Sequence, residues 1–349
     1  MLPQNSSKGK PKEKILQVDF FLHILYNKEN KGGIPMKYGF GVDLGGTTVK
    51  LAYFDQEGNM LDKWEIPTVK DGGGQQILPD IAAAIDGYIT KNSISREALL
   101  GIGIGVPGPV SPQGVVNKCV NLGWGVFNIE KELSGLTGLP VKAGNDATVA
   151  ALGECWKGGG VGCRNMIFAT LGTGVGGGII IEGKALHGAH GAGAEIGHMV
   201  INRQETEACG CGKYGCVEQY CSATGVVRMA KRYLAATEQA SGLRSVENLT
   251  CKDVFDAAKD GDAAAQAILE QVYAYLGEFL ANVANVVDPE VIVLGGGVSK
   301  AGQPLLEGVQ RHFGKYVFHA VSPVRFCLAT LGNDAGAYGS FQLVLSEFL

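Results

Sequence analysis

The sequence contains no apolar run long enough to cross a membrane, so a membrane-spanning protein is not expected. The segment VDFFLHIL (18–25) is too short to span a bilayer, and no small-residue cleavage site follows it, which argues against a secretory signal. Residues 1–35 hold six of the 30 basic and three of the 34 acidic residues, which leaves 24 basic and 31 acidic residues in the remainder. This negative balance argues against nucleic acid as the main partner. We therefore expect a cytoplasmic protein with neither a membrane nor a nucleic acid as a partner.

A disulfide framework and a collagen period are missing as well. Nine cysteines is an odd number, and four of them crowd into residues 209–221, which favours a cytosolic metal site. Glycine is abundant, 53 of 349 residues, but it shows no G-x-y period, which excludes a collagen-like chain. The glycines gather in short loops, where a bare backbone can approach a ligand closely. With 46% hydrophobic and 18% charged residues, the chain can form two domains or one large bilobed one.

Residues 1–35 differ from the rest of the chain. They form a lysine-rich, loosely patterned stretch, and a strongly patterned segment, MKYGFGVDLGGTTVK, begins at Met36. Two interpretations stay open. Met36 is the natural start, since a ribosome-binding site read through would encode Lys31-Gly32-Gly33, or residues 1–35 are a genuine flexible extension. In both cases we expect residues 1–35 to be dispensable for stability and activity.

Three glycine turns follow apolar strands. The segment YGFGVDLGGTTVKLAYFD (38–55) places alternating apolar residues on both sides of GGTT, and MIFATLGTGVGGGIIIEGKAL (166–186) repeats this strand–turn–strand pattern. A third strand, in VIVLGGGVS (291–299), is of the buried type and also ends in glycines. No helix is predicted after GGTT, so neither a P-loop nor a Rossmann motif fits. Single glycine turns are common, but three of them predict a nucleotide cleft in which backbone N–H groups surround phosphates.

An internal repeat indicates two similar lobes. GNDATVAALGE (144–154) resembles GNDAGAYGS (332–340), and in both an Asn-Asp pair is predicted to cap a helix of small residues. Phosphoryl transfer to a hydroxyl needs a carboxylate that takes the proton, and sequence physics alone does not choose between Asp146 and Asp334. Asp43, at the end of the first strand, is placed to orient a hydrated Mg²⁺. The alternatives are a turn-capping role for Asp43 and a plain helix cap for Asp146.

Five motifs together resemble the ROK family of repressors and sugar kinases, which belongs to the actin, hexokinase and Hsp70 superfamily. They are VDLGGTTVK, GVPGPV, GNDATVAALGE, TLGTGVGGGIIIEGKALHGAHGAGAEIGH and CGCGKYGCVEQY, and the match runs from about Met36 to the C-terminus. The resemblance implies an α/β, bilobed actin/hexokinase-like fold of the ribonuclease H-like type, with a central cleft between two α/β lobes. Residues 36–145, completed by a C-terminal helix at 333–349, are expected to form the N-terminal lobe, and residues 146–332 the C-terminal lobe.

Within the family, GVPGPVSPQGVVNKCVNLGW makes the chain most similar to the bacterial ATP-dependent glucokinases. This resemblance implies phosphorylation of the 6-hydroxyl of glucose by ATP with Mg²⁺, in a homodimer or homotetramer, and it assigns the general base to Asp146. The implied sugar-binding residues are Gly108, Asn121, Asn145, Asp146, Glu195, His198 and Glu218. The implied nucleotide-binding residues are Asp43, Gly45, Gly46, Thr47, Thr48, Lys50, Gly172, Thr173, Gly174, Gly295, Gly296 and Gly297.

The cysteine-rich segment EIGHMVINRQETEACGCGKYGCVEQY (195–220) is predicted to hold a structural zinc. Three soft thiolates and one imidazole suit a closed tetrahedral Zn²⁺, and the family match gives the same four positions: His198, Cys209, Cys211 and Cys216. The zinc would make Glu195, His198 and Glu218 converge on the sugar, with the second imidazole nitrogen offered to a hydroxyl. Hard phosphate oxygens call for Mg²⁺ instead. The alternatives are reduced cysteines without a metal, or Cys221 in place of His198 as fourth ligand.

Three other functions are weighed against a glucose kinase. A sugar-responsive repressor of the same family would need an N-terminal helix-turn-helix, and residues 1–35 are too short for its three helices. A zinc-stabilised scaffold without catalysis would not need the intact glycine turns. A kinase for another hexose, such as N-acetylmannosamine, fructose or allose, stays open because sugar choice depends on the shape of the pocket.

Overall fold

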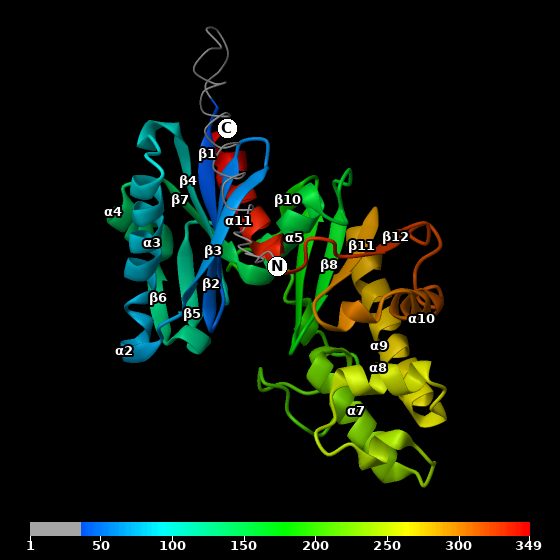
Figure 1. Cartoon of the computed structure of the whole chain (residues 1–349). Coiled ribbons are helices and arrows are strands. Elements are labelled where there is room, and N and C mark those ends of the chain that lie inside the picture. The colour runs from blue at the N-terminus through cyan, green and yellow to red at the C-terminus, as the bar shows by residue number, and fades with distance from the viewer. Residues whose placement is uncertain (1–35) are drawn as a thin grey trace, which may run out of the picture.

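The computed structural model describes residues 36–349, so the predictions made for residues 1–35 lie outside the described residues. Two five-stranded sheets stand on either side of a pair of helices (Figure 1). The first sheet has the order β3-β2-β1-β4-β7 and contains β1 (Tyr38–Leu44), β2 (Thr48–Asp55), β3 (Met60–Pro67), β4 (Leu99–Val106) and β7 (Val141–Asn145). The second has the order β10-β9-β8-β11-β12 and contains β8 (Met166–Leu171), β9 (Val175–Ile181), β10 (Lys184–Ala185), β11 (Val291–Gly295) and β12 (Arg325–Leu328).

The two sheets share one connectivity, which confirms the predicted internal repeat. In the first sheet, β1, β2 and β3 form an antiparallel meander, and β4 and β7 continue parallel to β1. In the second sheet, β8, β9 and β10 form the meander, and β11 and β12 continue parallel to β8. The glycine turns after β1 and β8 therefore join antiparallel strands, as the sequence predicted. We call the two halves the first lobe and the second lobe, and this bilobed α/β fold is the expected one.

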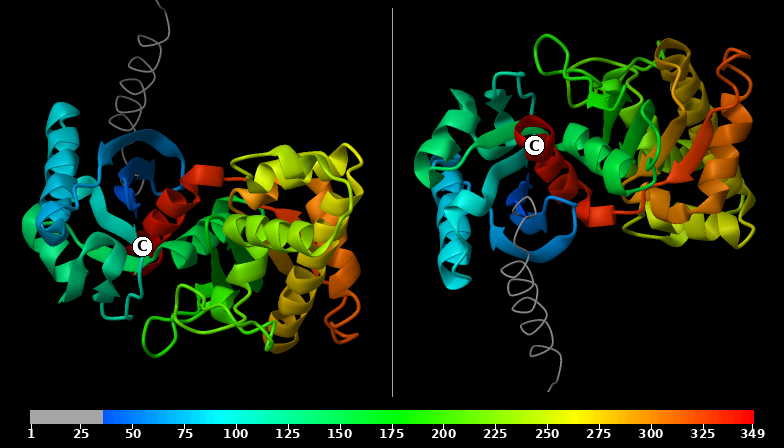
Figure 2. Two further views of the ribbon diagram at one scale, coloured as in Figure 1. Left: turned by 90° about the horizontal axis from the view of Figure 1, so that it is seen from below. Right: turned by 90° about the horizontal axis from the view of Figure 1, so that it is seen from above.

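Helices cover both faces of each sheet (Figures 1 and 2). The outer helices are α3 (Ile77–Lys91) and α4 (Ile129–Thr137) in the first lobe and α9 (Ala263–Val287) and α10 (Gln303–Phe313) in the second; the inner ones are α11 (Ala335–Phe348) and α5 (Asp146–Lys157). The remaining elements are α2 (Asp71–Gly74), α6 (Glu218–Cys221), α7 (Ala223–Ala236), α8 (Cys251–Lys259), and the hairpin strands β5 (Val115–Cys119) and β6 (Trp124–Asn128). Short 3₁₀ helices lie at Arg96–Ala98, Val120–Leu122, Ile196–His198, Gly242–Ser245, Val298–Ala301 and Gly332–Asp334. Within residues 36–349, no helix has the length and apolarity needed to cross a bilayer.

Each lobe folds around its own apolar core. In the first lobe, Phe40 and Ile104 of the sheet are buried against Ile81 of α3. In the second, Leu294 of β11 is buried against Val272 of α9. Because the two cores are separate, each lobe has its own source of hydrophobic stability, and the relative position of the lobes depends on the helices between them.

Glycines allow α5 and α11 to cross closely between the sheets. A Cβ atom at Gly339 of α11 would lie 1.6 Å from the carbonyl oxygen of Val149, and one at Gly153 of α5 would lie 2.2 Å from that of Ala335. Side chains at either position would push the helices apart. Since α5 leaves the first sheet after β7 and α11 returns to it after β12, this crossing is where the described chain passes between the lobes.

The two Asn-Asp pairs differ, and the cap predicted at the second pair is wrong. At the start of α5, the Asn145 side chain accepts a hydrogen bond from the N–H of Thr148 at 3.1 Å, as a helix cap should. Helix α11 begins at Ala335 without a side-chain capping hydrogen bond. The Asp334 carboxylate lies instead 2.8 Å from the Lys63 ammonium on β3. This ion pair takes up the carboxylate that was expected to help cap α11.

Candidate active site

Asp146 is the first residue of α5 and lies where β7 ends. Its Oδ1 atom accepts hydrogen bonds from the N–H of Ala147 at 2.8 Å and from the Asn145 amide at 3.0 Å. The same Asn145 amide also donates to the carbonyl oxygen of Gly108 at 3.3 Å. Both bonds to Asp146 end on Oδ1, so the carboxylate is held in one orientation while Oδ2 can face a substrate.

Burial, together with the nearby carboxylates of Asp43 and Glu195, raises the pKa of Asp146 to about 6, while the hydrogen bond from Ala147 opposes the change. The charges of Asp43 and Glu195 act on Asp146 because the fold brings three carboxylates from separate segments into one site. A carboxylate with a pKa near neutrality is suited to accept a proton at physiological pH. This environment separates Asp146 from an ordinary helix-capping residue.

Asp43 and Lys50 lie on the two strands that flank the first glycine turn. The Lys50 ammonium is 3.6 Å from the Asp43 carboxylate and donates to the carbonyl oxygen of Asn333 at 3.3 Å. Burial raises the pKa of Asp43, although Lys50 opposes this effect. A Cβ atom at Gly336 of α11 would lie 2.6 Å from the Asp43 carboxyl carbon, so the glycine makes room for the carboxylate. Asp43 thus lies where α11 packs against the first sheet.

The glycine turn at 45–48 is held by its own backbone. The N–H of Gly45 donates to the carbonyl oxygen of Thr48 at 3.0 Å, and the hydroxyl of Thr68 donates to the carbonyl oxygen of Gly45 at 2.8 Å. Gly46 and Thr47 complete this turn between β1 and β2. The conformation of the turn is therefore fixed by hydrogen bonds within the protein.

The turns at 172–174 and 295–297 meet at one edge of the second sheet. They follow β8 and β11, which are parallel neighbours, so both strands end at the same edge. Gly296 has φ +80°, and a Cβ atom there would lie 2.5 Å from the carbonyl oxygen of Leu171. Glycine is required at this contact, and it brings the two turns together. Ligands of open α/β sheets bind at such carboxyl edges of parallel strands.

The start of α7 adjoins the turn at 172–174, a feature that sequence reasoning missed. The N–H of Ala223 donates to the carbonyl oxygen of Gly172 at 2.8 Å, and the hydroxyl of Thr224 donates to that of Thr173 at 2.8 Å. Ser222 caps α7 by accepting from the N–H of Gly225 at 2.9 Å. A serine before a helix is a recognisable start signal, but the sequence does not show which turn the helix faces.

The four predicted metal ligands form one cluster: the ligand atoms of His198, Cys209, Cys211 and Cys216 all lie within 4.8 Å of one another. The Cys211 and Cys216 sulfurs are 3.7 Å apart, and the Cys209 sulfur lies 3.9 Å from Nδ1 of His198. A tetrahedral zinc with bonds of about 2.3 Å separates two sulfurs by about 3.8 Å, so the donor set fits this ion. Cys221 lies elsewhere, fully buried in the core of the second lobe.

Glu218 joins the cysteine segment to the turn at 172–174. Its Oε2 atom accepts from the N–H of Val175 at 3.0 Å, and its Oε1 atom lies 3.6 Å from the Cys209 sulfur. A Cβ atom at Gly174 would lie 2.2 Å from Oε2, so the carboxylate fits only beside a glycine. Glu218, a predicted sugar ligand, therefore links the cluster of His198 and the cysteines with the turn at 172–174.

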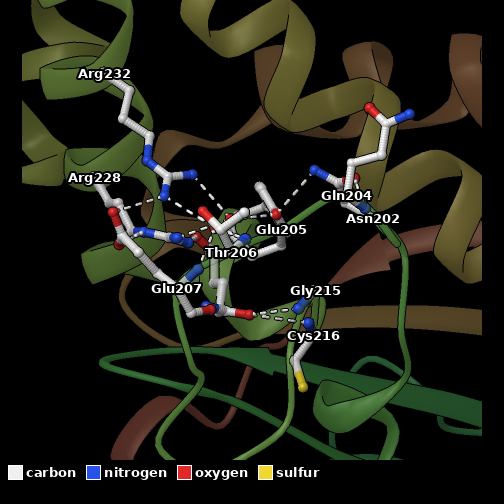
Figure 3. A network of polar contacts seen from close by, with 11 residues as sticks. Asn202, Gln204, Glu205, Thr206, Glu207, Gly215, Cys216, Arg228 and Arg232 are labelled. Atoms are coloured by element: carbon white, nitrogen blue, oxygen red, sulfur yellow. Dashed lines mark hydrogen bonds and ion pairs between the residues drawn. The ribbon is translucent and has the colours of Figure 1, made fainter.

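A network of ion pairs joins the cysteine segment to α7 (Figure 3). The carboxylate of Glu205 is buried and lies 2.8 and 3.0 Å from the two terminal nitrogens of Arg232 on α7. It also lies 2.7 Å from Arg228 and accepts a hydrogen bond from the hydroxyl of Tyr220 at 2.5 Å. The hydrogen bond with Arg232 holds the pKa of Glu205 well below its usual range. Glu207 pairs with the same two arginines, so α7 anchors this part of the segment.

Gln219 connects the anchored residue Glu207 to the backbone of Gly215 and Cys216 by hydrogen bonds. Its side-chain oxygen accepts from the N–H groups of Gly215 and Cys216 at 2.8 and 3.1 Å, and its amide donates to the carbonyl oxygen of Glu207 at 2.9 Å. The backbone that carries Cys216 is therefore fixed by hydrogen bonds to the Gln219 side chain.

Two other predicted sugar-site residues, Gly108 and Glu195, lie near Asn145 and Asp146. The carbonyl oxygen of Gly108 accepts a hydrogen bond from the Asn145 amide. Asn121 is exposed in the 3₁₀ turn between β5 and β6, and the thiol of Cys119, just before this turn, donates to the carbonyl oxygen of Pro107 at 2.7 Å. Glu195 is exposed and directly precedes the 3₁₀ helix that carries His198. Segments of both lobes thus meet at the start of α5.

Comparison with known proteins agrees with this geometry. Residues 39–347 match the ROK family. The chain is 45% identical over 312 residues to the glucokinase of Halalkalibacterium halodurans, and this alignment covers 88% of the chain and 94% of that protein. A crystal structure of a ROK family glucokinase from Streptomyces griseus in complex with glucose and AMPPNP has a TM-score of 0.70, is 33% identical, and is matched over 88% of this chain and 98% of that chain. A xylose repressor of Caldicellulosiruptor bescii is 28% identical over 314 residues, which cover 88% of this chain and 78% of that protein. The chain therefore belongs to the ROK family.

Proposed function

We propose that this protein is a hexose kinase that transfers phosphate from ATP to the 6-hydroxyl of glucose. The observation that carries the proposal is the environment of Asp146. Its carboxylate is held by Asn145 and the start of α5, burial raises its pKa to about 6, and it faces residues of both lobes. The 45% identity with the glucokinase of H. halodurans over most of both chains supports glucose as the sugar.

Asp146 acts as the general base in this proposal. Its Oδ2 atom accepts the proton of the sugar hydroxyl as that oxygen attacks the terminal phosphate of ATP. Asn145 keeps the carboxylate in position through its bond to Oδ1. Asp334, the other candidate from the sequence, pairs with Lys63 at 2.8 Å and is thereby directed away from such a role.

The glycine turns provide the nucleotide site. Backbone N–H groups at 45–48 and 172–174 would surround the phosphates, and the turn at 295–297 would contact the adenosine part of ATP. Asp43 would orient a hydrated Mg²⁺, and Lys50 at its side adds a positive charge. When bound, Mg²⁺ neutralises the charge of the phosphates, which favours attack by the hydroxyl.

The metal cluster has a structural role in this proposal. His198, Cys209 and the two other cysteines would hold a zinc, which suits a set of three thiolates and one imidazole. Nδ1 of His198 faces the Cys209 sulfur, which leaves Nε2 for a sugar hydroxyl. The loop thereby positions Glu195 and His198 at the sugar. Assembly as a homodimer or homotetramer and a cytoplasmic location are further proposals, drawn from the family resemblance.

A sugar-responsive repressor is the second candidate, since the chain is 28% identical to the C. bescii xylose repressor over 314 residues. The raised pKa of Asp146 favours the kinase, because it suits proton transfer, which a sensor of sugar does not need.

An assay of ADP release over a panel of hexoses and N-acetylhexosamines tests the proposal. We expect glucose to give the highest kcat/KM, with phosphate on the 6-oxygen as identified by ³¹P-coupled NMR. Faster turnover of another sugar would support a hexose kinase but would show that glucose is not its preferred substrate. Absence of sugar-dependent ADP release with every sugar would contradict the proposal.

A further inference from the structure

The carboxylate of Glu154 lies in α5, fully buried, with backbone amides as its partners. Its Oε2 atom accepts from the N–H groups of Gly159 at 2.8 Å and Thr330 at 3.1 Å, and its Oε1 atom accepts from the N–H of Leu331 at 2.9 Å. Burying a carboxylate is unfavourable unless hydrogen bonds compensate for the lost water. Three N–H donors meet that requirement here, so the arrangement is a built one.

The three donors come from the two segments that join the inner helices, α5 and α11, to the second sheet. Residues 157–160 lead from α5 into β8, and residues 329–332 lead from β12 back to α11 (Figure 1). A Cβ atom at Gly158 would lie 2.0 Å from Oε2 of Glu154, so the first connection passes directly over the carboxylate. One side chain therefore binds both connections to the same helix.

The lobes contribute different parts of the proposed active site. Asn145 and Asp146 belong to the end of β7 and the start of α5, whereas Glu195 and the turn at 172–174 belong to the second lobe. Their separate cores leave the relative position of the lobes to the connecting segments. Glu154 lies eight residues after Asp146 on one rigid helix, about 12 Å along its axis, so it can relate the base to the second lobe.

We propose that Glu154 is a positioning residue. Its carboxylate holds both connections against α5 and thereby fixes the second lobe relative to Asp146. The effect on turnover rests on the proposed kinase function, whereas the effect on the two connections does not.

The test compares Glu154→Gln with Glu290→Gln as a matched control. Glu290 also accepts two backbone hydrogen bonds, from Arg164 at 2.8 Å and Asn165 at 2.9 Å, but both donors lie within the second lobe. Glutamine keeps the size of each side chain and replaces one acceptor oxygen by a donor. We expect kcat at saturating glucose and ATP to fall at least about tenfold in Glu154→Gln, because small displacements of reacting groups are costly. In Glu290→Gln we expect kcat within about twofold of the wild type.

Hydrogen exchange with mass spectrometry reports on the connections without activity. We expect peptides that cover 157–160 and 329–332 to exchange faster together in Glu154→Gln, and those around 164–165 to stay protected. The control should show the reverse. Both measurements are made well below the melting temperature of either variant, so that a general loss of stability does not lower kcat.

A Glu154→Gln protein with wild-type kcat, or with unchanged exchange in both connections, overturns the proposal. A tenfold loss of kcat in Glu290→Gln as well would show a general effect and would also overturn it. If the wild type phosphorylates no sugar, the proposed function fails, and the exchange experiment alone decides the role of Glu154. Should Glu154→Gln not fold, Gly158→Ala displaces the same carboxylate and must show the same joint increase in exchange.

Discussion

The two Asn-Asp pairs lie at the two connections between the lobes, and the same dipeptide behaves differently at each. At 145–146, the asparagine caps α5 and the aspartate has a pKa raised to about 6 by burial. At 333–334, no side chain caps α11, and the aspartate forms an ion pair with Lys63 at 2.8 Å. The difference shows that burial and neighbouring charges, rather than the dipeptide itself, set the environment of each carboxylate.

The largest expected effect comes from removing the carboxylate of Asp146, with Asp334 as the comparison. We expect Asp146→Asn to lower kcat by about 10²- to 10⁴-fold, the usual contribution of a general base, with glucose binding largely intact. Asp334→Asn should keep kcat within about threefold, since it removes only a partly exposed ion pair. Steady-state kinetics and calorimetric glucose binding check both.

Stability separates loss of the base from loss of the fold. Because burial raises the folded-state pKa of Asp146 above its ordinary value, the charged form destabilises the fold at pH values above about 6. The melting temperature of Asp146→Asn at pH 8 should therefore equal or exceed that of the wild type. Near-normal kcat in Asp146→Asn would assign the base to another group, with Asp334 as the first to examine.

Removing one cysteine ligand tests whether the cysteine segment holds Glu195 and His198 in position. We expect Cys211→Ala to lose zinc and to raise the KM for glucose at least about tenfold, because the ligand set positions Glu195 and His198. The KM for ATP should change less, since the glycine turns belong to other segments. Losing a structural metal should also lower the melting temperature.

Elemental analysis for zinc, made beside both KM values, checks this expectation. Cys251→Ala is a suitable control, because Cys251 lies at the start of α8 and outside the metal cluster. The positioning role of the cysteine segment would be contradicted if the wild-type protein contained no zinc or if Cys211→Ala kept its affinity for glucose. The cysteines would then be small reduced core residues without a role in the site.

The smallest expected effect concerns the caps themselves. Asn145→Ala removes a side-chain cap and should lower the free energy of unfolding by about 1 kcal/mol. Asn333→Ala removes no cap and should change it by less than about 0.5 kcal/mol. Urea denaturation of both variants measures the difference. Equal losses would mean that the two pairs are structurally equivalent after all.

Local patterns in the sequence predicted the features that depend on neighbouring residues. Alternating apolar residues around glycines predicted the hairpins at 38–55 and 166–186, because strand pairing across a short turn is a local property. The spacing of the cysteines and His198 predicted the cluster that the structure gathers within 4.8 Å. In each case the relevant partners lie within about 20 residues of one another.

Features that depend on distant partners could not be predicted. The capture of Asp334 by Lys63 joins residues 271 positions apart, and the bonds from Glu154 to Thr330 and Leu331 join residues 176 and 177 positions apart. Nothing in the local sequence distinguishes Glu154 from a solvent-facing helix residue. The contact of Thr224 with Thr173 likewise depends on how α7 packs against the second sheet.

The pH dependence of kcat/KM tests the central claim most directly, because it reads the protonation of the base in the unaltered protein. A carboxylate must be ionised to accept a proton, and burial raises the pKa of Asp146 to about 6. We therefore expect kcat/KM for glucose to fall about tenfold per pH unit below pH 6, with this limb absent from the residual activity of Asp146→Asn. A kcat/KM that stays constant down to pH 4.5 in the folded wild type would contradict the assignment of Asp146 as a buried general base.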